Sequence, residues 1–212
     1  MRIILIFMFI SCAFGHSIDY TNNQQSSVLK ELHKVVPFIS HDEPKRLYGT
    51  YLIRNIAYEP VQKIRKYIER KRNIVLAHRG EAHITVITPP EYNSMKKWKS
   101  SISMSEINSL VKPIIQNLNF DILGIGSLRG KNNRDEETQV FFIVVQSNGL
   151  RFLRELVALK YKIPKTVFNP LAQDFHITVG FTKSDLFPRP GFEARKEVSS
   201  LVEDLKIESI FK

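Results

Sequence analysis

The chain has 212 residues, of which 43% are hydrophobic and 25% charged, with a formal net charge of +10. This composition is typical of soluble globular proteins and excludes a low-complexity or disordered chain, and the length allows one fairly large domain or two small lobes. The basic charge is compatible with a polyanionic partner or a phosphorylated substrate, and equally with a solvated basic surface.

The first fifteen residues differ in kind from the rest. Arg2 precedes an apolar run over residues 3–14, which is too short for a membrane-spanning helix and suits the core of a signal peptide. We therefore expect cleavage before His16 and a protein that is secreted or lumenal in the secretory pathway, with no stable membrane insertion after cleavage. The alternative is an uncleaved anchor. Because the single cysteine, Cys12, lies in this segment, the mature chain should contain neither disulfides nor cysteine metal sites.

The remaining chain alternates helical and extended patterns. Residues 16–46 are expected to form an N-terminal helix and a linker, and residues 47–212 one domain. In chain order, that domain is predicted to contain a strand at 47–57, a helix at 60–71, a strand at 81–88, helices at 91–99 and 105–117, strands at 120–129 and 138–147, a helix at 149–160, a strand at 174–182 and a final helix at 193–205. Strand, helix and strand occur in both halves, which indicates a duplicated α+β unit.

Two stretches of this domain have nearly the same sequence. The first is Glu81-Ala82-His83-Ile84-Thr85-Val86, and the second is Asp174-Phe175-His176-Ile177-Thr178-Val179. With six histidines and eight threonines in the chain, about 0.2 His-x-Thr matches are expected by chance. Two copies that share four consecutive letters are therefore unlike an accidental match.

Strand geometry gives these two stretches a chemical meaning. Side chains alternate along a strand, so His83 and Thr85 share one face, and His176 and Thr178 share one face in the same way. If the two strands lie side by side, two imidazoles and two hydroxyls line one groove. One neutral imidazole can accept a proton from a nucleophile while the other, protonated, donates one to a leaving oxygen, and hydroxyls can hold phosphate oxygens. The alternative is two ordinary strands, each with a satisfied histidine.

Three further residues are candidates for the same site. Arg79, just before the break at Gly80, is a candidate substrate-binding residue, with a surface arginine as the alternative. Glu81 and Asp174 each lie two residues before a histidine on the same strand face. A carboxylate there could orient the imidazole by accepting its Nδ1 proton, and it would raise the imidazole pKa. Alternatively, both carboxylates only mark solvent-exposed strand starts.

Together with the upstream Gly124-Ile125-Gly126, the two motifs resemble the 2H phosphoesterase superfamily and, within it, the Swiss Army Knife 2H phosphoesterase group. The resemblance covers about residues 47–190. It implies an α+β, bilobal, pseudo-twofold fold with two antiparallel sheets flanking a groove and helices outside. It also implies catalytic roles for His83, Thr85, His176 and Thr178, no obligatory metal, and activity on cyclic phosphates or phosphodiesters, often at RNA ends.

The function expected from these observations is a metal-independent phosphodiesterase that acts on a 2′,3′-cyclic phosphate or a related nucleotide or RNA phosphoester. We expect it to need no cofactor, to bind a nucleotide or RNA-end phosphate as substrate, and to be a monomer. Two alternatives stay open. One is a non-catalytic module that binds nucleotides or RNA ends, and the other is an RNA ligase that runs the same chemistry towards bond formation.

Overall fold

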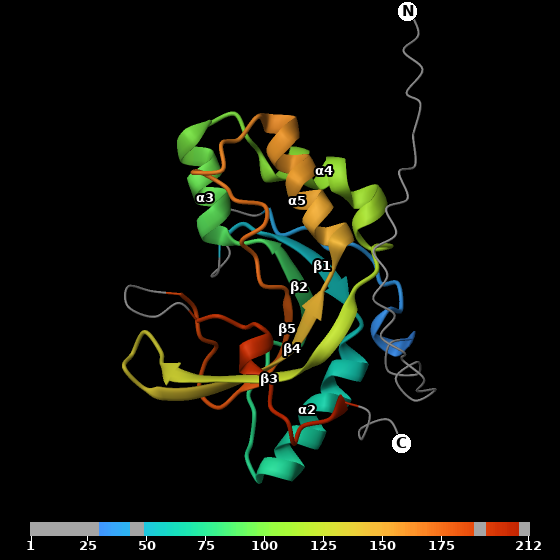
Figure 1. Ribbon diagram of the computed structural model, residues 1–212, viewed down its shortest axis with the longest axis vertical. Helices are drawn as coiled ribbons and strands as arrows, with labels where there is room; N and C mark the ends of the chain where they lie inside the picture. Colours follow the sequence, from blue (N-terminus) through green and yellow to red (C-terminus); the bar gives the residue numbers. More distant parts are fainter. Residues whose placement is uncertain (1–29, 43–48, 189–193, 208–212) are drawn as a thin grey trace, which may run out of the picture.

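The computed structural model describes residues 30–42, 49–188 and 194–207. Figure 1 shows the arrangement of its elements, which follow one another as β1 (Leu52–Ile56), α2 (Tyr58–Arg72), β2 (Ala82–Ile87), α3 (Pro89–Trp98), α4 (Met104–Ile115), β3 (Asp121–Lys131), β4 (Glu137–Gln146), α5 (Asn148–Tyr161), β5 (His176–Phe181) and the short 3₁₀ helix η1 (Val198–Ser200). The expected signal peptide at residues 1–15 and its cleavage site lie outside the described residues.

The five strands form one antiparallel sheet in the order β1-β2-β5-β4-β3. The expectation of an α+β fold is confirmed, but the expectation of two separate sheets flanking a groove is wrong for the residues described. The physical reason is that β2 and β5 bond to each other, with Ile84 opposite Ile177. This pairing gives hydrogen-bond partners to backbone groups that would otherwise lie on two sheet edges, and it joins the two halves into one continuous sheet.

The duplicated unit inferred from the sequence is visible in the topology. β1-α2-β2 in the first half corresponds to β4-α5-β5 in the second. The two helices are exchanged across the junction, since α2 packs against β5 and α5 packs against β2. Figure 1 accordingly shows α2 at one end of the strands and α3, α4 and α5 at the other.

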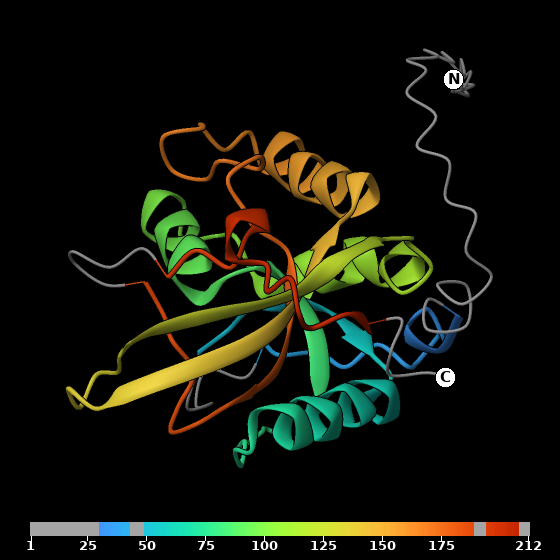
Figure 2. The same ribbon diagram turned by 60° about the horizontal axis from the view of Figure 1, so that its bottom comes forward.

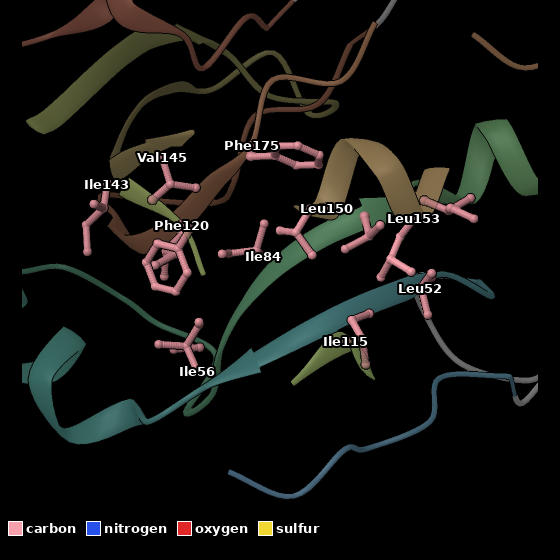
Figure 3. Close-up of a cluster of buried hydrophobic side chains, with 14 of the residues drawn as sticks. Leu52, Ile56, Ile84, Ile115, Phe120, Ile143, Val145, Leu150, Leu153 and Phe175 are labelled. Atoms are coloured by element: carbon pink, nitrogen blue, oxygen red, sulfur yellow. The ribbon is translucent and has the colours of Figure 1, made fainter. Parts of the chain in front are cut away.

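One face of the sheet is closed by a large hydrophobic cluster. Ile84 and Val86 of β2 and Ile177 and Val179 of β5 belong to it and are almost completely inaccessible to solvent. Apolar residues of α2, α3, α4 and α5 belong to the same cluster, and Figure 3 shows Ile84 among residues from several of these elements. Because strand side chains alternate, burial of these aliphatic residues directs the intervening histidines and threonines to the opposite face.

Arg154 of α5 is a buried cation that ties the ends of both motif strands together. Its side chain is 0% exposed and forms an ion pair with Glu91 of α3, Nη2 to Oε1 2.6 Å. It also donates to the carbonyl of Val86 in β2 and to the carbonyls of Asn169 and Pro170, in the loop that leads to β5. This guanidinium therefore connects the end of β2, helix α3 and the loop before β5.

The segments at the two ends of the domain differ from expectation. Only residues 30–32 of the N-terminal helix are described as helical, and the following residues pack against β1, where Ile39 N donates to Asn55 Oδ1 at 3.0 Å. The expected final helix at 193–205 is wrong, since residues 194–207 contain only η1. Leu201 instead bridges to Gly126 of β3, and Val202 N donates to the Ile125 carbonyl. Bonds to the sheet thus replace helical bonds, and Figure 2 shows this segment crossing the strands.

None of the helices in residues 30–42, 49–188 and 194–207 has the length and apolar character needed to cross a bilayer.

We predict that Arg154→Met lowers the free energy of unfolding by about 3–5 kcal/mol, because it leaves Glu91 and three carbonyls without their buried cation. Urea unfolding followed by circular dichroism measures this change. The matched control is Arg151→Met, one turn earlier on α5, whose guanidinium donates an exposed bond to the Leu171 carbonyl and lies 5.7 Å from the Phe175 ring centroid. Its expected cost is below about 1 kcal/mol. Equal losses in the two variants would contradict the role assigned to Arg154.

Candidate active site

The pairing of β2 with β5 brings the two His-x-Thr motifs together on one face of the sheet. Ile84 lies opposite Ile177 in an antiparallel register, so His83 lies opposite Thr178 and Thr85 lies opposite His176. Each histidine is thus beside the threonine of the other motif. The two histidines are diagonal neighbours, for which backbone separations of about 7–8 Å are typical. This spacing leaves room for a small group between the two imidazoles.

His176 is held by its own strand and by a neighbouring aromatic ring. Its Nδ1 lies 3.1 Å from the Asp174 carbonyl, which can only accept a hydrogen bond, so in the neutral imidazole Nδ1 carries the proton and Nε2 is free to accept one. The ring of Phe142 on β4 packs edge-on against it, with centroids 5.9 Å apart. Burial, followed by the nearby Lys196 ammonium, lowers the pKa of His176 to about 3.

Gly126 makes the position of that aromatic ring possible. It pairs with Phe142 across β3 and β4, and a Cβ built on Gly126 would lie 2.4 Å from the Phe142 ring. A side chain at residue 126 would therefore displace Phe142 from its place beside His176. The Gly124-Ile125-Gly126 segment thus clears space beside the motif face, since Leu201 lies against Gly124 in the same way.

His83 has a different environment. Its side chain is 12% exposed, and its Nδ1 lies 3.5 Å from Glu81 Oε1, longer than a good hydrogen bond. Tyr51 and His41 lie beside it, with ring centroids 6.0 Å and 6.5 Å from that of His83. Burial, followed by the positive charges of Arg79 and His41, lowers the pKa of His83 to about 4. The pKa of His83 is thus lowered although Glu81 lies nearby, and an orienting role for this carboxylate stays a prediction.

Arg79 is brought to the site by a short bridge between distant segments. Ala77 and Phe181 exchange two backbone hydrogen bonds of 2.8 and 3.0 Å, which fix residues 77–80 beside the end of β5. Gly80 then turns the chain into β2 with φ of +75°, a conformation that a side chain would strain. In the same segment, His78 is hydrogen-bonded to the Tyr58 hydroxyl at 2.6 Å.

A buried ion cluster lies next to both histidines. Asp185 Oδ2 accepts from Arg79 at 3.0 Å, and Asp185 Oδ1 accepts from Lys196 at 2.7 Å. Burial opposes the charge of Asp185, but Lys196 and then Arg79 outweigh it and hold the pKa of this carboxyl below its usual range. The Asp185 carboxylate therefore lies between two cations. Cations of this kind also bind the oxygens of a phosphate.

A small pocket opens beside the motif strands. His83 and Thr178 line it together with His78, Arg79, Glu81 and residues 179–181, whereas Thr85 and His176 do not. Its volume of about 10 Å³ is enough for roughly a single water molecule. A phosphate group would therefore require the loop at 77–80, or the side chains on it, to move.

The structure places the residues predicted from the sequence as follows. The motif residues His83, Thr85, His176 and Thr178 lie on one face, and Arg79 lines the adjoining pocket. Glu81 approaches His83 without a close bond, and Asp174 contacts His176 through its backbone carbonyl rather than its carboxylate.

Sequence reasoning missed four residues around the histidines. They are His41, Tyr51, Asp185 and Lys196. His41 and Tyr51 belong to no motif, and the Asp185–Lys196 pair joins two segments that have no recognisable spacing. In the sequence they differ from other residues only in being polar or titratable, and many surface residues share this property.

Within the described part of the chain, no three histidine, cysteine, aspartate or glutamate side chains gather in the way a metal ion requires.

Chemically, this arrangement offers two imidazoles in diagonal positions, two hydroxyls and a nearby guanidinium. Paired imidazoles can act as general base and general acid on one phosphorus centre, and hydroxyl and guanidinium donors can stabilise charge on its oxygens. The cations near His83 and His176 attract an anion, and a bound anion would raise the pKa of both imidazoles.

Comparison with known families agrees with this geometry. The family described as "Swiss Army Knife, 2H phosphoesterase domain" matches residues 51–187, more than half of the chain and a region that contains both motifs. No curated protein and no solved structure matches the chain. On the strength of the family match, the chain belongs to the Swiss Army Knife group of the 2H phosphoesterases.

Proposed function

We propose that this protein is a phosphodiesterase that opens a 2′,3′-cyclic phosphate or a related nucleotide or RNA-end phosphoester by hydrolysis. Membership of the 2H phosphoesterases suggests phosphoesterase activity in general. The observation that carries the finer proposal is the β2–β5 pairing, which sets His83 and His176 as diagonal neighbours on one face. Such a pair can act on both sides of one phosphorus atom.

The surroundings of the two histidines support a different role for each. His176 Nδ1 faces a carbonyl, so its Nε2 is the proton acceptor and His176 is the general base. His83 lines the pocket and lies near the Glu81 carboxylate, which favours its protonated form, so it is the general acid. These assignments distinguish two residues that the repeated motif leaves equivalent.

The proposed reaction is a single displacement. A water oxygen attacks phosphorus while His176 Nε2 accepts the water proton. The bond from phosphorus to the ribose oxygen breaks, and that oxygen receives the proton of His83. Thr85 and Thr178 donate hydrogen bonds to the non-bridging oxygens, and Arg79 balances the charge that develops there. A second proton exchange with solvent restores both imidazoles.

A second candidate function is a nucleotide-binding module without turnover. The observation that favours it is the lowered pKa of both histidines, about 4 and about 3, which leaves neither imidazole protonated near pH 7 to act as an acid. Incubation of the purified protein with a panel of cyclic nucleotides and phosphorylated RNA ends separates the two functions, because binding without product formation would support the module.

We predict that His83→Ala and His176→Ala each reduce kcat by about 10²- to 10⁴-fold, the usual contribution of a positioned acid or base. Thr85→Ala and Thr178→Ala should have smaller effects. His33→Ala is the matched control, since this imidazole packs on Phe120 of the hydrophobic cluster. Near-normal turnover in a folded His83 or His176 variant would sink the two-histidine mechanism.

We predict that the pH optimum of kcat/KM lies in the acid range, near the pKa values of about 4 for His83 and about 3 for His176. In the free enzyme the reactive form needs one protonated and one neutral imidazole, and this form becomes scarce as pH rises above both values. The optimum of kcat should lie at higher pH, because bound phosphate raises both pKa values.

Lys196→Met tests the cause of this shift. Removing the ammonium should move the kcat/KM optimum to higher pH, since Lys196 lowers the pKa of both histidines. Lys206→Met, an exposed lysine in the same segment, is the control and should leave the optimum in place. An optimum that stays fixed in Lys196→Met would show that this charge does not tune the histidines.

We also predict that turnover persists after exhaustive treatment with EDTA, because every proposed step uses side chains of this chain. Activity that disappears in chelator and returns with a divalent ion would contradict the mechanism.

A further inference from the structure

We propose that a second cavity, next to the histidine pocket, is a subsite for a second phosphate group of a nucleotide substrate. This inference rests on the proposed function and extends it from a reaction to a class of substrate. The cavity has a volume of about 450 Å³ and shares Arg79 and Phe181 with the histidine pocket. A volume of this size lies in the range of small-molecule sites and accommodates a nucleotide.

The walls of this cavity come from two tethered segments. One is the turn between β3 and β4, where Asn132 Oδ1 accepts from Arg134 N at 2.8 Å and from Glu136 N at 3.0 Å. The other is the segment after β5, where Lys183 N and Ser184 N donate to Thr138 Oγ1. The bonds to Asn132 fix the shape of the turn, and the bonds to Thr138 attach the second segment to β4. Figure 2 shows the β3–β4 hairpin extending away from the helices.

The charges in the cavity favour an anion. Arg134 and Lys183 are exposed, and among the described residues neither side chain forms an ion pair. The cavity also contains two carboxylates. Asp185 is neutralised by Arg79 and Lys196, and Glu136 accepts a hydrogen bond from the Asn132 amide. Arg134 and Lys183 thus remain available for a phosphate, which both side chains bind well.

An aromatic surface lies beside these cations. Phe187 is 47% exposed and lines the cavity, and the Arg79 guanidinium lies over its ring at 5.7 Å. A flat exposed ring next to cations suits a nucleobase, because bases stack on aromatic side chains. Arg79 lies between the two cavities and can contact a phosphate in either one. The inferred substrate therefore carries at least two phosphates and a base that can stack on Phe187.

Equilibrium binding tests the subsite without depending on turnover. Adenosine 3′-monophosphate and adenosine 3′,5′-bisphosphate are titrated into the wild-type protein by calorimetry at fixed ionic strength. We expect the bisphosphate to bind at least about tenfold more tightly, as one additional charge-assisted contact of ordinary strength would give. In the double variant Arg134→Ala/Lys183→Ala the affinity ratio should fall to about one.

Lys131→Ala is the matched control, since Lys131 lies in the same hairpin but pairs with Asp135 at 3.0 Å outside the cavity lining. It should keep the wild-type ratio. If the double variant misfolds, Arg134→Gln/Lys183→Gln replaces it and should give the same loss of selectivity. A wild-type ratio near one, no detectable binding of the bisphosphate, or a ratio unchanged in the double variant would each overturn the proposal.

A turnover arm separates this proposal from the proposed function. Adenosine 2′,3′-cyclic phosphate is compared with the same compound carrying a 5′-phosphate. If the enzyme is a phosphodiesterase with this subsite, kcat/KM is higher for the 5′-phosphorylated compound, and the advantage disappears in the double variant. If neither compound is hydrolysed but the binding ratio behaves as expected, the reaction is wrong for these compounds and the subsite stands.

Discussion

The antiparallel pairing of β2 with β5 is the constraint on which the rest of the structure depends. Ile84 and Ile177 face each other in this pair, and both are completely buried. If either strand slipped by one residue, its isoleucine would turn to the opposite face and its histidine would point into the hydrophobic cluster. The register is therefore held by the hydrophobic effect on one face, and the same register fixes the imidazoles on the other.

The site depends equally on charges that sit close to the imidazoles. Arg79 and Lys196 share the Asp185 carboxylate. Burial and Lys196 lower the pKa of both histidines, and Arg79 lowers that of His83 as well. Such a site is poorly suited to holding an imidazolium while it is empty. Arrival of a phosphate would supply the missing negative charge, so substrate binding and protonation of the acid are thermodynamically linked.

Much of the fold could be predicted from local pattern, because strand alternation and helix caps are properties of neighbouring residues. The two motif strands and the face that their histidines and threonines share follow from the order of Ile, Thr, Val and His. The helix inside each half follows from its own apolar periodicity. The number of sheets could not be predicted, since it depends on whether two strand edges far apart in sequence bond to each other. The final helix was wrong for a related reason. Leu201 and Val202 belong to a segment with a helical pattern of apolar residues. Their partners in β3 are far away in the sequence, so a local pattern cannot reveal these bonds.

Lys196 lies beyond residue 187, where the match to the family ends, yet its ammonium is buried against a carboxylate inside that region. The matched region alone therefore lacks one of the two cations that pair with Asp185. Two proteins could share the strands, the histidines and the threonines and still differ in the acidity of their sites, if their C-terminal segments supply different charges. The motif and the pH at which it works can then change independently in evolution. The residues that set this pH can lie outside the matched region, as Lys196 does.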